Sequence, residues 1–360
     1  MTSRADRGVV NADFEVPRGM QSGHLQSIRN RIRPRRYDLN RLATARHVRI
    51  PMTDGSGDRL AVVLHRSRVD RQAPGTGPGV VLLVHGLGGS AESVYMRASA
   101  AGLLAAGFNV ARVDLRSAGE SKATTRQTYH AGKTDDLRDV LRFLADQPEA
   151  VGPRGEAALA VMGFSLGGAM TLKLLGEPYE GLPIDAGVAV SAPLDLVVGS
   201  IHLSGSLFGL YEKAIVRTLR RDATAPGPDG SSRLTSAEAA GLSRARTLPE
   251  FDDALTAPRH GWRDALEYYE VNSAEAYLPR IAVPTLVIHA LDDPMIPSIP
   301  YLRIDWDELG RNGQVQRAIT PRGGHVGFHQ RGNPMPWYVG RARDFLLRVA
   351  DGAPGGGMSE

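Results

Sequence analysis

The sequence predicts an α/β protein, with a mostly parallel central sheet, helices on both faces and an inserted, mainly helical cap. From residue 60 onward, short apolar segments alternate with helix-like segments, an order typical of parallel sheets covered by helices. The alternation stops between Pro193 and Pro279, where helix-like pieces occur without a strong strand. Because this interval is too long for a simple crossover connection, it indicates an insertion.

The predicted strands are short runs rich in apolar and β-branched residues. The run 79–84, GVVLLV, is almost continuous in such residues, as expected for a strand that is buried on both faces. The other predicted strands are 59–66, 108–115, 157–163, 186–193, 284–290 and, more weakly, 314–320.

The predicted helices lie between these strands. Ser90 is placed to cap a helix that runs to Ala106, and Gly107 is placed to end it. Thr134 precedes a second helix, and two more are predicted over 166–175 and 336–349. Both the second and the last helix carry an apolar stripe, formed by Leu137, Val140, Leu141 and Leu144 and by Ala342, Phe345, Leu346 and Val349.

These elements divide the chain into an extension, a core, a cap and a tail. Residues 1–46 form an N-terminal extension expected to pack on the core, which comprises residues 47–193 and 279–350. Residues 194–278 form the cap, and residues 351–360 a flexible tail. Within the cap, the Gly-, Pro- and Ser-rich stretch DATAPGPDGSSRLTS predicts a mobile loop.

Composition restricts the classes of protein and site to consider. A hydrophobic content of 42% with 23% charged residues is typical of a globular protein. No apolar run reaches the length of a membrane-spanning helix, and the first residues lack the pattern of a secretory signal, so a cytoplasmic protein is expected. The absence of cysteine excludes disulfides, thiolate zinc sites and a cysteine nucleophile.

Basic residues are concentrated in the segment RNRIRPRR, although the net charge of the chain is only +4. Such a run could contact nucleic acid or anionic lipid. Because no interleaved aromatic residues or nucleic-acid motif accompany it, we interpret it as a solvated segment and expect no nucleic-acid partner. We expect no stable membrane insertion, while peripheral contact stays open.

A serine flanked by glycines lies between a predicted strand and a predicted helix. Gly163-Phe164-Ser165-Leu166-Gly167 has the form G-x-S-x-G, in which the glycines let strand and helix approach while the serine occupies a strained turn. The lysine of a phosphate-binding P-loop and the G-x-G-x-x-G of a dinucleotide site are both missing here. We therefore predict that Ser165 is a nucleophile and that the Leu166 N–H, at the helix start, stabilises an oxyanion.

A second glycine-rich turn, His85-Gly86-Leu87-Gly88-Gly89, follows the strand predicted at 79–84. Its glycines allow a backbone N–H to turn into a cleft, so Leu87 is the predicted second oxyanion donor. A generic glycine-rich turn is the alternative interpretation. His85 itself is expected to be structural.

A serine hydroxyl needs a base, and the base needs an acid to orient it. His325 lies in the glycine-rich stretch PRGGHVGF, where glycines leave room for it to reach the serine, so it is preferred to His329. Two carboxylates, Asp292 and Asp293, follow the strand predicted at 284–290, and only one of them is expected to face the histidine. Asp114, which precedes the serine in the chain, is expected to brace loops.

These segments together resemble the α/β-hydrolase superfamily, and more narrowly its YheT-like branch, over about residues 13–349. The resemblance implies an α/β-hydrolase fold. It rests on GHLQSI, HGLGGSAESVYMR, DLRSAGES, YHAGKTDDLRDVLRFL, GFSLGG, SAPLDL, ALDDPMIP and GGHVGF. His24-Leu25-Gln26-Ser27 is similar to the HLQT-like motif of this branch, with serine in place of threonine. Related loops have the spacing D-x-x-x-P, which selects Asp293, four residues before Pro297, as the acid.

The resemblance implies a serine carboxylesterase, with Ser165 as nucleophile, His325 as base and Asp293 as orienting acid. It would hydrolyse small acyl esters, some of them lipid-like, through an acyl-enzyme and without a metal or organic cofactor. Ser117-Ala118 stands where relatives carry a glycine-containing sequence, and the cap has its own composition, so preference for acyl-chain length does not carry over.

Two other functions remain as alternatives. A thioesterase or acyltransferase on acyl-CoA-like substrates would use the same three residues. A non-catalytic ligand-binding protein on the same fold would normally lack one of them.

Overall fold

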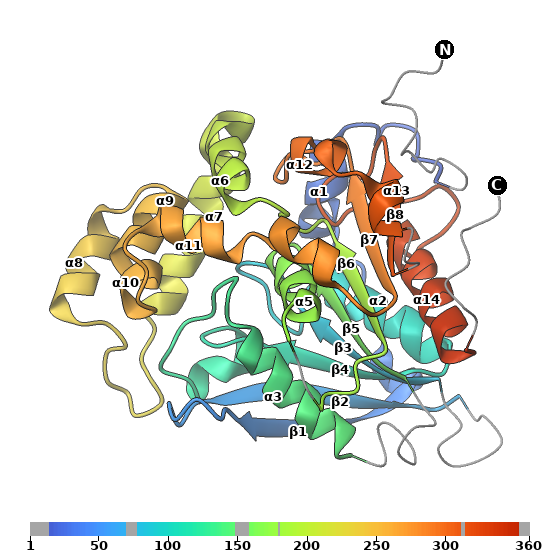
Figure 1. Cartoon of the computed structure of the whole chain (residues 1–360), viewed down its shortest axis with the longest axis horizontal. Helices are drawn as coiled ribbons and strands as arrows, with labels where there is room; N and C mark the ends of the chain where they lie inside the picture. Colours follow the sequence, from blue (N-terminus) through green and yellow to red (C-terminus); the bar gives the residue numbers. More distant parts are fainter. Residues whose placement is uncertain (1–13, 70–77, 148–157, 179–180, 311–313, 353–360) are drawn as a thin grey trace.

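A computed structural model describes residues 14–69, 78–147, 158–178, 181–310 and 314–352. Its centre is an eight-stranded sheet with the order β1-β2-β4-β3-β5-β6-β7-β8 (Figure 1). β1 pairs with β2, and β2 with β4, in antiparallel fashion, while all other neighbours are parallel. The strands are β1 Ala43–Pro51, β2 Arg59–Ser67, β3 Gly79–Val84, β4 Asn109–Asp114, β5 Ala158–Phe164, β6 Ala186–Val190, β7 Thr285–Ala290 and β8 Val315–Thr320.

Helices cover both faces of the sheet, and the central strand β3 shows how the layers arise. All six residues of β3 are buried. Val80, Leu82 and Val84 pack in one core cluster with α3 (Thr134–Ala145) and α5 (Leu166–Gly176). Val81 and Leu83 pack in the other with α2 (Val94–Ala105) and α14 (Trp337–Ala350). Alternate side chains point to opposite faces of a strand, so one apolar run supports two helical layers.

The first strand of the sheet was not predicted from the sequence. β1 lies at the sheet edge, and its residues are mostly exposed, with several charged or polar side chains. Such a strand lacks the apolar pattern by which the others are recognised. The predicted boundary between extension and core at residue 46 therefore falls inside β1.

The helix predicted from Ser90 begins later than expected, because residues 90–93 form a turn of their own. In this turn the Ser93 N–H donates to the Ser90 carbonyl, and the Ser93 hydroxyl accepts from the Ser90 N–H. Helix α2 starts at Val94. Its predicted end is confirmed, since Gly107 has φ +90° and donates its N–H to the Leu104 carbonyl.

The segment between β6 and β7 is mainly helical, as predicted. It contains α6 Leu196–Gly205, η3 Ser206–Gly209, α7 Leu210–Ala223, α8 Ser236–Arg244, α9 Leu248–Phe251, the π-helical turn η4 Asp252–Thr256, α10 Ala257–Arg259, α11 Ala265–Asn272 and η5 Ala274–Arg280. Most of these helices form a group beside the carboxyl ends of the parallel strands (Figure 1). The remaining short elements are α1 Gly23–Ile32, η1 Leu39–Arg41, η2 Gly119–Ala123, α12 Ile299–Arg303 and α13 Trp306–Gly310.

The stretch predicted as a mobile loop is held against the core. Arg233, which is buried, donates hydrogen bonds to the carbonyls of Lys122 and Asp222, and Lys122 forms an ion pair with Asp222 at 2.8 Å. The glycines and prolines exclude regular secondary structure here, whereas the anchoring depends on side chains from distant parts of the chain.

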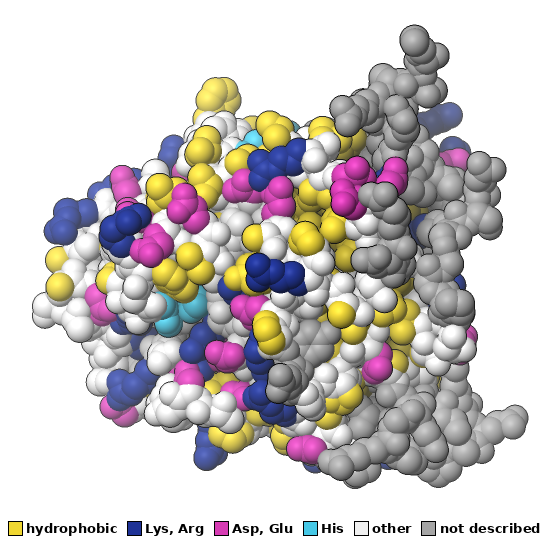
Figure 2. All heavy atoms as spheres, viewed as in Figure 1, with side chains coloured by type: hydrophobic (Ala, Val, Ile, Leu, Met, Phe, Trp, Pro, Cys, Tyr) yellow, Lys and Arg dark blue, Asp and Glu magenta, His cyan; other side chains and the backbone are white. Residues whose placement is uncertain are grey.

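The surface carries mixed charge. In Figure 2, Lys and Arg are interspersed with Asp and Glu over the visible face. In the basic segment, Arg31, Arg33 and Arg36 are exposed, while Arg29 and Arg35 are half-buried. Among the described helices, none combines the length and apolar character needed to cross a bilayer.

Candidate active site

Ser165 occupies the turn between β5 and α5 in a backbone conformation that is rare for a non-glycine residue. Its φ is +50° and its ψ is −122°, and its N–H donates to the Val190 carbonyl at 2.9 Å. A Cβ on Gly163 would lie 2.0 Å from the Gly167 carbonyl oxygen, and one on Gly167 would lie 2.5 Å from the His85 carbonyl oxygen. The glycine spacing of the motif therefore reflects close approach of strand, helix and neighbouring loop.

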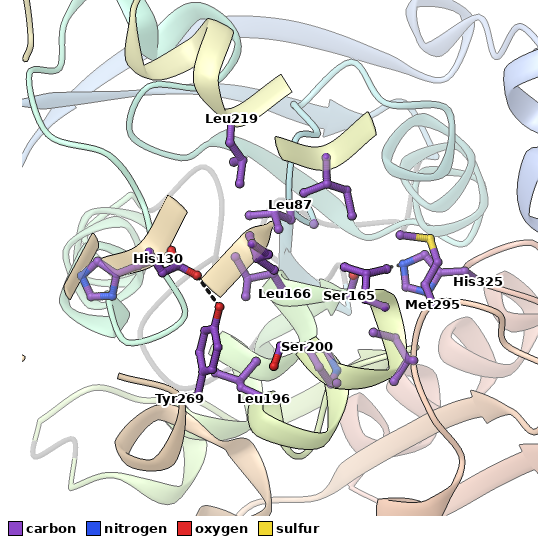
Figure 3. A pocket seen from close by; sticks show the side chains of 18 of the residues that line it. Leu87, His130, Ser165, Leu166, Leu196, Ser200, Leu219, Tyr269, Met295 and His325 are labelled. Carbon is purple, nitrogen blue, oxygen red and sulfur yellow. Dashed lines mark hydrogen bonds between the residues drawn. The ribbon is translucent and has the colours of Figure 1, made fainter. Parts of the chain in front are cut away.

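The predicted histidine and one of the two aspartates lie in line with this serine. The Nε2 atom of His325 is 3.0 Å from the Ser165 hydroxyl, and its Nδ1 atom is 2.9 Å from Oδ2 of Asp293. Figure 3 shows His325 beside Ser165 at one side of a cavity. The three residues come from loops after β5, β7 and β8, at the carboxyl edge of the sheet.

The two neighbouring aspartates have different partners. Oδ1 of Asp293 accepts from the N–H groups of Met295 and Ile296, which leaves Oδ2 for His325. Burial opposes ionisation of Asp293, but the adjacent His325 holds the pKa of this carboxyl below its usual value. Asp292 instead accepts from the Gly324 N–H at 2.8 Å, and burial raises its pKa.

The loop after β3 lies against the serine. A Cβ on Gly86 would be 2.8 Å from the Ser165 Cβ, so only glycine allows this approach. The N–H groups on either side of Leu87 are occupied: that of Gly86 donates to the Tyr95 hydroxyl and that of Gly88 to the Tyr129 hydroxyl. Within the described residues, no hydrogen bond is found for the Leu87 N–H or for that of Leu166 at the start of α5. Two amide donors beside Ser165 are thus free for a ligand oxygen.

Sequence reasoning did not single out Tyr95 or Tyr129, which hold this loop. Both lie in segments that had been quoted only for their family resemblance. Their hydroxyl groups accept backbone N–H bonds at 3.0 and 2.6 Å; Tyr129 is buried and Tyr95 is half-buried. A tyrosine pattern of this kind has no local signal, because the bonds connect residues 9 and 41 positions apart.

Helix α1 contacts the loop that carries His325. The Ser27 hydroxyl accepts from the His325 N–H at 2.7 Å, and the buried Gln26 side chain bonds both the N–H and the carbonyl of His329. A Cβ on Gly324 would lie 2.2 Å from the Gly23 carbonyl oxygen. The HLQS motif therefore contacts the core through the histidine loop.

Asp114 and His85, the remaining candidates, make the hydrogen bonds of structural residues. Asp114 accepts from the N–H groups of Ala91 and Glu120 and so joins two loops. His85 is fully buried, accepts from the Leu115 N–H at Nε2 and bonds the Gly86 carbonyl through Nδ1. Neither side chain is hydrogen-bonded to Ser165 or His325.

A cavity of about 270 Å³ opens beside Ser165, between the sheet edge and the cap helices. Apolar side chains line much of it, among them Leu87, Leu166, Leu196 and Leu219, and Figure 3 shows Leu166 between Ser165 and Tyr269. The cap therefore supplies much of the surface that a bound molecule would contact.

Comparison with known proteins agrees with this geometry. Residues 79–331 match the family model described as alpha/beta hydrolase fold. The chain is 31% identical over 350 residues to the "Putative esterase YheT" of Escherichia coli, covering 96% of each chain. It is 27% identical over 269 residues to a protein of Saccharomyces cerevisiae named "Monoacylglycerol lipase", covering 72% of this chain but only 57% of that one.

Solved structures show the same fold. The Pyrococcus furiosus esterase Pf2001 aligns over 95% of this chain and 97% of its own with a TM-score of 0.55, at 18% sequence identity. The fold, the match over most of the chain and the similarity along the full length of YheT lead to one conclusion. This chain belongs to the alpha/beta-hydrolase fold family, in its YheT-like branch.

Proposed function

We propose that this protein is a serine carboxylesterase that hydrolyses small acyl esters, with Ser165, His325 and Asp293 as its catalytic residues. The observation that carries the proposal is the pair of short contacts, 3.0 Å from Ser165 to His325 and 2.9 Å from His325 to Asp293. The names of the relatives, an esterase and a monoacylglycerol lipase, point to the same bond class.

In the first half of the reaction, His325 takes the proton of Ser165 as its oxygen attacks the ester carbonyl carbon. The carbonyl oxygen becomes an oxyanion, which accepts hydrogen bonds from the Leu87 and Leu166 N–H groups. One such donor is typically worth about 3–4 kcal/mol of the barrier. His325 then gives its proton to the departing alcohol, and an acyl-enzyme remains on Ser165.

In the second half, His325 removes a proton from water, which attacks the acyl-enzyme and releases the acid. Asp293 orients the imidazole through Nδ1 and stabilises the imidazolium. Its second oxygen is held by two backbone N–H groups, so the carboxylate keeps one direction throughout.

The test is the Ser165→Ala variant, assayed with p-nitrophenyl esters and with a fluorophosphonate probe. Removing the nucleophile should abolish both ester turnover and covalent labelling. A nearby serine that lines the same cavity, Ser200, provides the matched control, and Ser200→Ala should still be labelled. Labelling that persists in Ser165→Ala would contradict the assignment of the nucleophile.

Acyl transfer to an acceptor other than water is a second candidate. A relative at 29% identity, covering 75% of this chain and 62% of its own, is named "Medium-chain fatty acid ethyl ester synthase/esterase 2". The same acyl-enzyme would react with an alcohol or be formed from an acyl-CoA-like thioester. Comparing p-nitrophenyl esters with acyl-CoA, with and without added ethanol, separates hydrolysis, thioester cleavage and transfer.

A further inference from the structure

The end of the cavity remote from Ser165 is polar. Figure 3 shows Tyr269 and His130 on the opposite side of the cavity from Ser165 and His325. Two further polar residues of the lining, Asp252 and Thr256, belong to the π-helical turn η4 in the cap. π-Helical turns are rare and often occur at functional sites.

Asp252 is a buried carboxyl without a basic partner. It is only 6% exposed, and its two oxygens accept from the hydroxyls of Thr256 at 2.6 Å and Tyr269 at 2.7 Å. No described lysine, arginine or histidine forms an ion pair with it. A carboxylate has about four acceptor positions, so two hydroxyls leave part of its capacity unused on a cavity wall. Burial raises the pKa of Asp252 to about 6, in keeping with this lack of compensation.

His130 lies at the same end of the cavity, but it is a neutral ring and does not supply Asp252 with a basic partner. Its Nδ1 atom accepts from the Gly132 N–H at 3.1 Å, which leaves the proton of the neutral ring on Nε2. That Nε2 atom is buried and has no hydrogen-bond partner among the described residues. Burial lowers the pKa of His130 well below its usual value, so the ring is neutral.

The unused acceptor capacity of Asp252 fits a hydroxyl group, which can donate a hydrogen bond to it. An ammonium group would also satisfy Asp252, but it would have to pass the apolar middle of the cavity as a charge. A methyl-ended chain would leave the unused acceptor positions of Asp252 without a partner, which is costly for a buried polar group.

We propose that this end of the cavity is a subsite for an alcohol, and that the esters this protein prefers carry a hydroxyl at the far end of an apolar chain. The proposal rests on the proposed esterase function and names its substrate class. Asp252 is the residue that receives the hydroxyl, and Leu166, Leu196 and Leu219 contact the chain between the two ends.

The experiment uses p-nitrophenyl esters of increasing acyl length, each in a methyl-ended and a hydroxyl-ended form with equal numbers of non-hydrogen atoms. At one chain length the wild type should prefer the hydroxyl-ended ester by about 10-fold or more in kcat/KM, since a site built to bond a hydroxyl rejects an analogue that lacks it. An ammonium-ended ester of the same length should be poorer than the hydroxyl-ended one.

Three variants locate the effect. Asp252→Leu should remove the preference, and Asp252→Asn should reduce it. In each variant the kcat/KM for the long esters is expressed relative to that for p-nitrophenyl acetate, which is too short to reach the subsite. The matched control is Asp253→Asn, because Asp253 is an exposed neighbour on the same turn and does not line the cavity. If Asp252→Leu does not fold, the isosteric Asp252→Asn carries the test.

Binding to Ser165→Ala distinguishes failure of this proposal from failure of the esterase proposal. Thermal shifts of this variant with a hydroxyl-ended long-chain methyl ketone, which cannot be hydrolysed, should exceed those with the matched methyl-ended ketone, whether or not Ser165 is the nucleophile. The subsite proposal is overturned if the wild type shows no preference at any length, if it prefers the ammonium-ended ester, or if Asp253→Asn changes the preference as much as Asp252→Leu does.

Discussion

Ser165 is held in a strained conformation by contacts that leave no room for alternatives. A positive φ at a non-glycine residue costs about 1–3 kcal/mol and persists only where the surroundings impose it. Here Gly86, Gly163 and Gly167 bring three backbone segments against the turn. The consequence is a serine oxygen directed at His325 and flanked by two free N–H groups, so the strain has a functional counterpart.

Also at the scale of residues, Asp292 and Asp293 test whether the direction of a carboxylate side chain determines its role in catalysis. Asp293→Asn should lower kcat by roughly 10⁴-fold, because an amide in its place favours the wrong tautomer of His325. Asp292→Asn should have a far smaller effect, since an amide oxygen can still accept from the Gly324 N–H. Steady-state kinetics on a p-nitrophenyl ester measures both. The reverse order of effects would exchange the two roles.

At the scale of elements, helix α1 supports the loop of His325 from a remote part of the sequence. Ser27 and His325 are 298 positions apart, yet a 2.7 Å hydrogen bond joins them. The same helix contacts the cap, because His24 bonds the Tyr211 hydroxyl of α7 at 2.9 Å and stacks on its ring. The N-terminal extension therefore contacts both the histidine loop and the cap.

The Ser27 contact predicts a kinetic effect. Ser27→Ala leaves the His325 N–H without its acceptor and should lower kcat by about 10-fold, with KM less affected, because the imidazole is less well positioned. Ser27→Thr keeps the hydroxyl and should restore kcat. Equal losses of kcat in the two variants would show that side-chain size, not the hydrogen bond, matters at this position.

The turn η4 makes stability depend on pH. Burial raises the pKa of Asp252 from its ordinary value of 3.8 to about 6 in the folded protein, so the folded state binds this proton more tightly. Its contribution to stability is fully present below pH 4 and is lost as the pH rises to about 6, by about 3 kcal/mol in total. Thr256 and Tyr269 lessen this shift by hydrogen bonding, and Asp253 adds to it.

Asp252→Asn removes that titration. Relative to the wild type, the variant should become more stable as the pH is raised from 4.5 to 7.5, as measured by urea unfolding at each pH. Taking the difference between the two proteins cancels the other carboxyls, several of which have lowered pKa values and the opposite pH dependence. A difference that does not change with pH would mean that Asp252 is ionised as readily in the folded as in the unfolded chain.

At the scale of the whole molecule, the cap and the core are joined at several points around the cavity. Ser206 of the cap donates to the Pro294 carbonyl beside Asp293, the Tyr268 hydroxyl accepts from the Ala131 N–H, and Lys122 pairs with Asp222. The cap is thus fixed to the loop of Asp293 and to two other segments of the core. Its position affects both the cavity wall and the site.

The ion pair between Lys122 and Asp222 tests this attachment. Asp222 is largely buried, so the loss of its partner Lys122 should lower the free energy of unfolding by about 1–3 kcal/mol. The loss of an exposed ion pair would lower it less. In Lys122→Met, limited proteolysis should cut residues 224–235 faster than in the wild type. The exposed pair of Arg343 and Asp344 is the control, and Arg343→Met should leave the cleavage rate unchanged. Equal rates in all three proteins would mean that the segment is anchored by other contacts.

Local backbone requirements explain what could be predicted from the sequence. The strand–Ser165–helix motif, the glycine-rich turn at Gly86 and the helix end at Gly107 each depend on conformations that particular residues favour or require. The alternation of apolar runs indicated the layers of the fold, because a strand that is buried on both faces is apolar along its whole length. Only the edge strand β1, which is mostly exposed, left no such pattern.

Only the tertiary structure could decide in which direction a side chain points and which residues far apart in the chain are in contact. Asp292 and Asp293 are chemically identical neighbours, and the hydrogen bonds of their loop determine which oxygen reaches His325. The support of His325 by Ser27 and the placement of Asp252 at the cavity end join residues far apart in the chain. By itself the sequence determined the local geometry of the nucleophile. The packing of the chain decided the partners around it, because those contacts form only when the cap, extension and core are assembled.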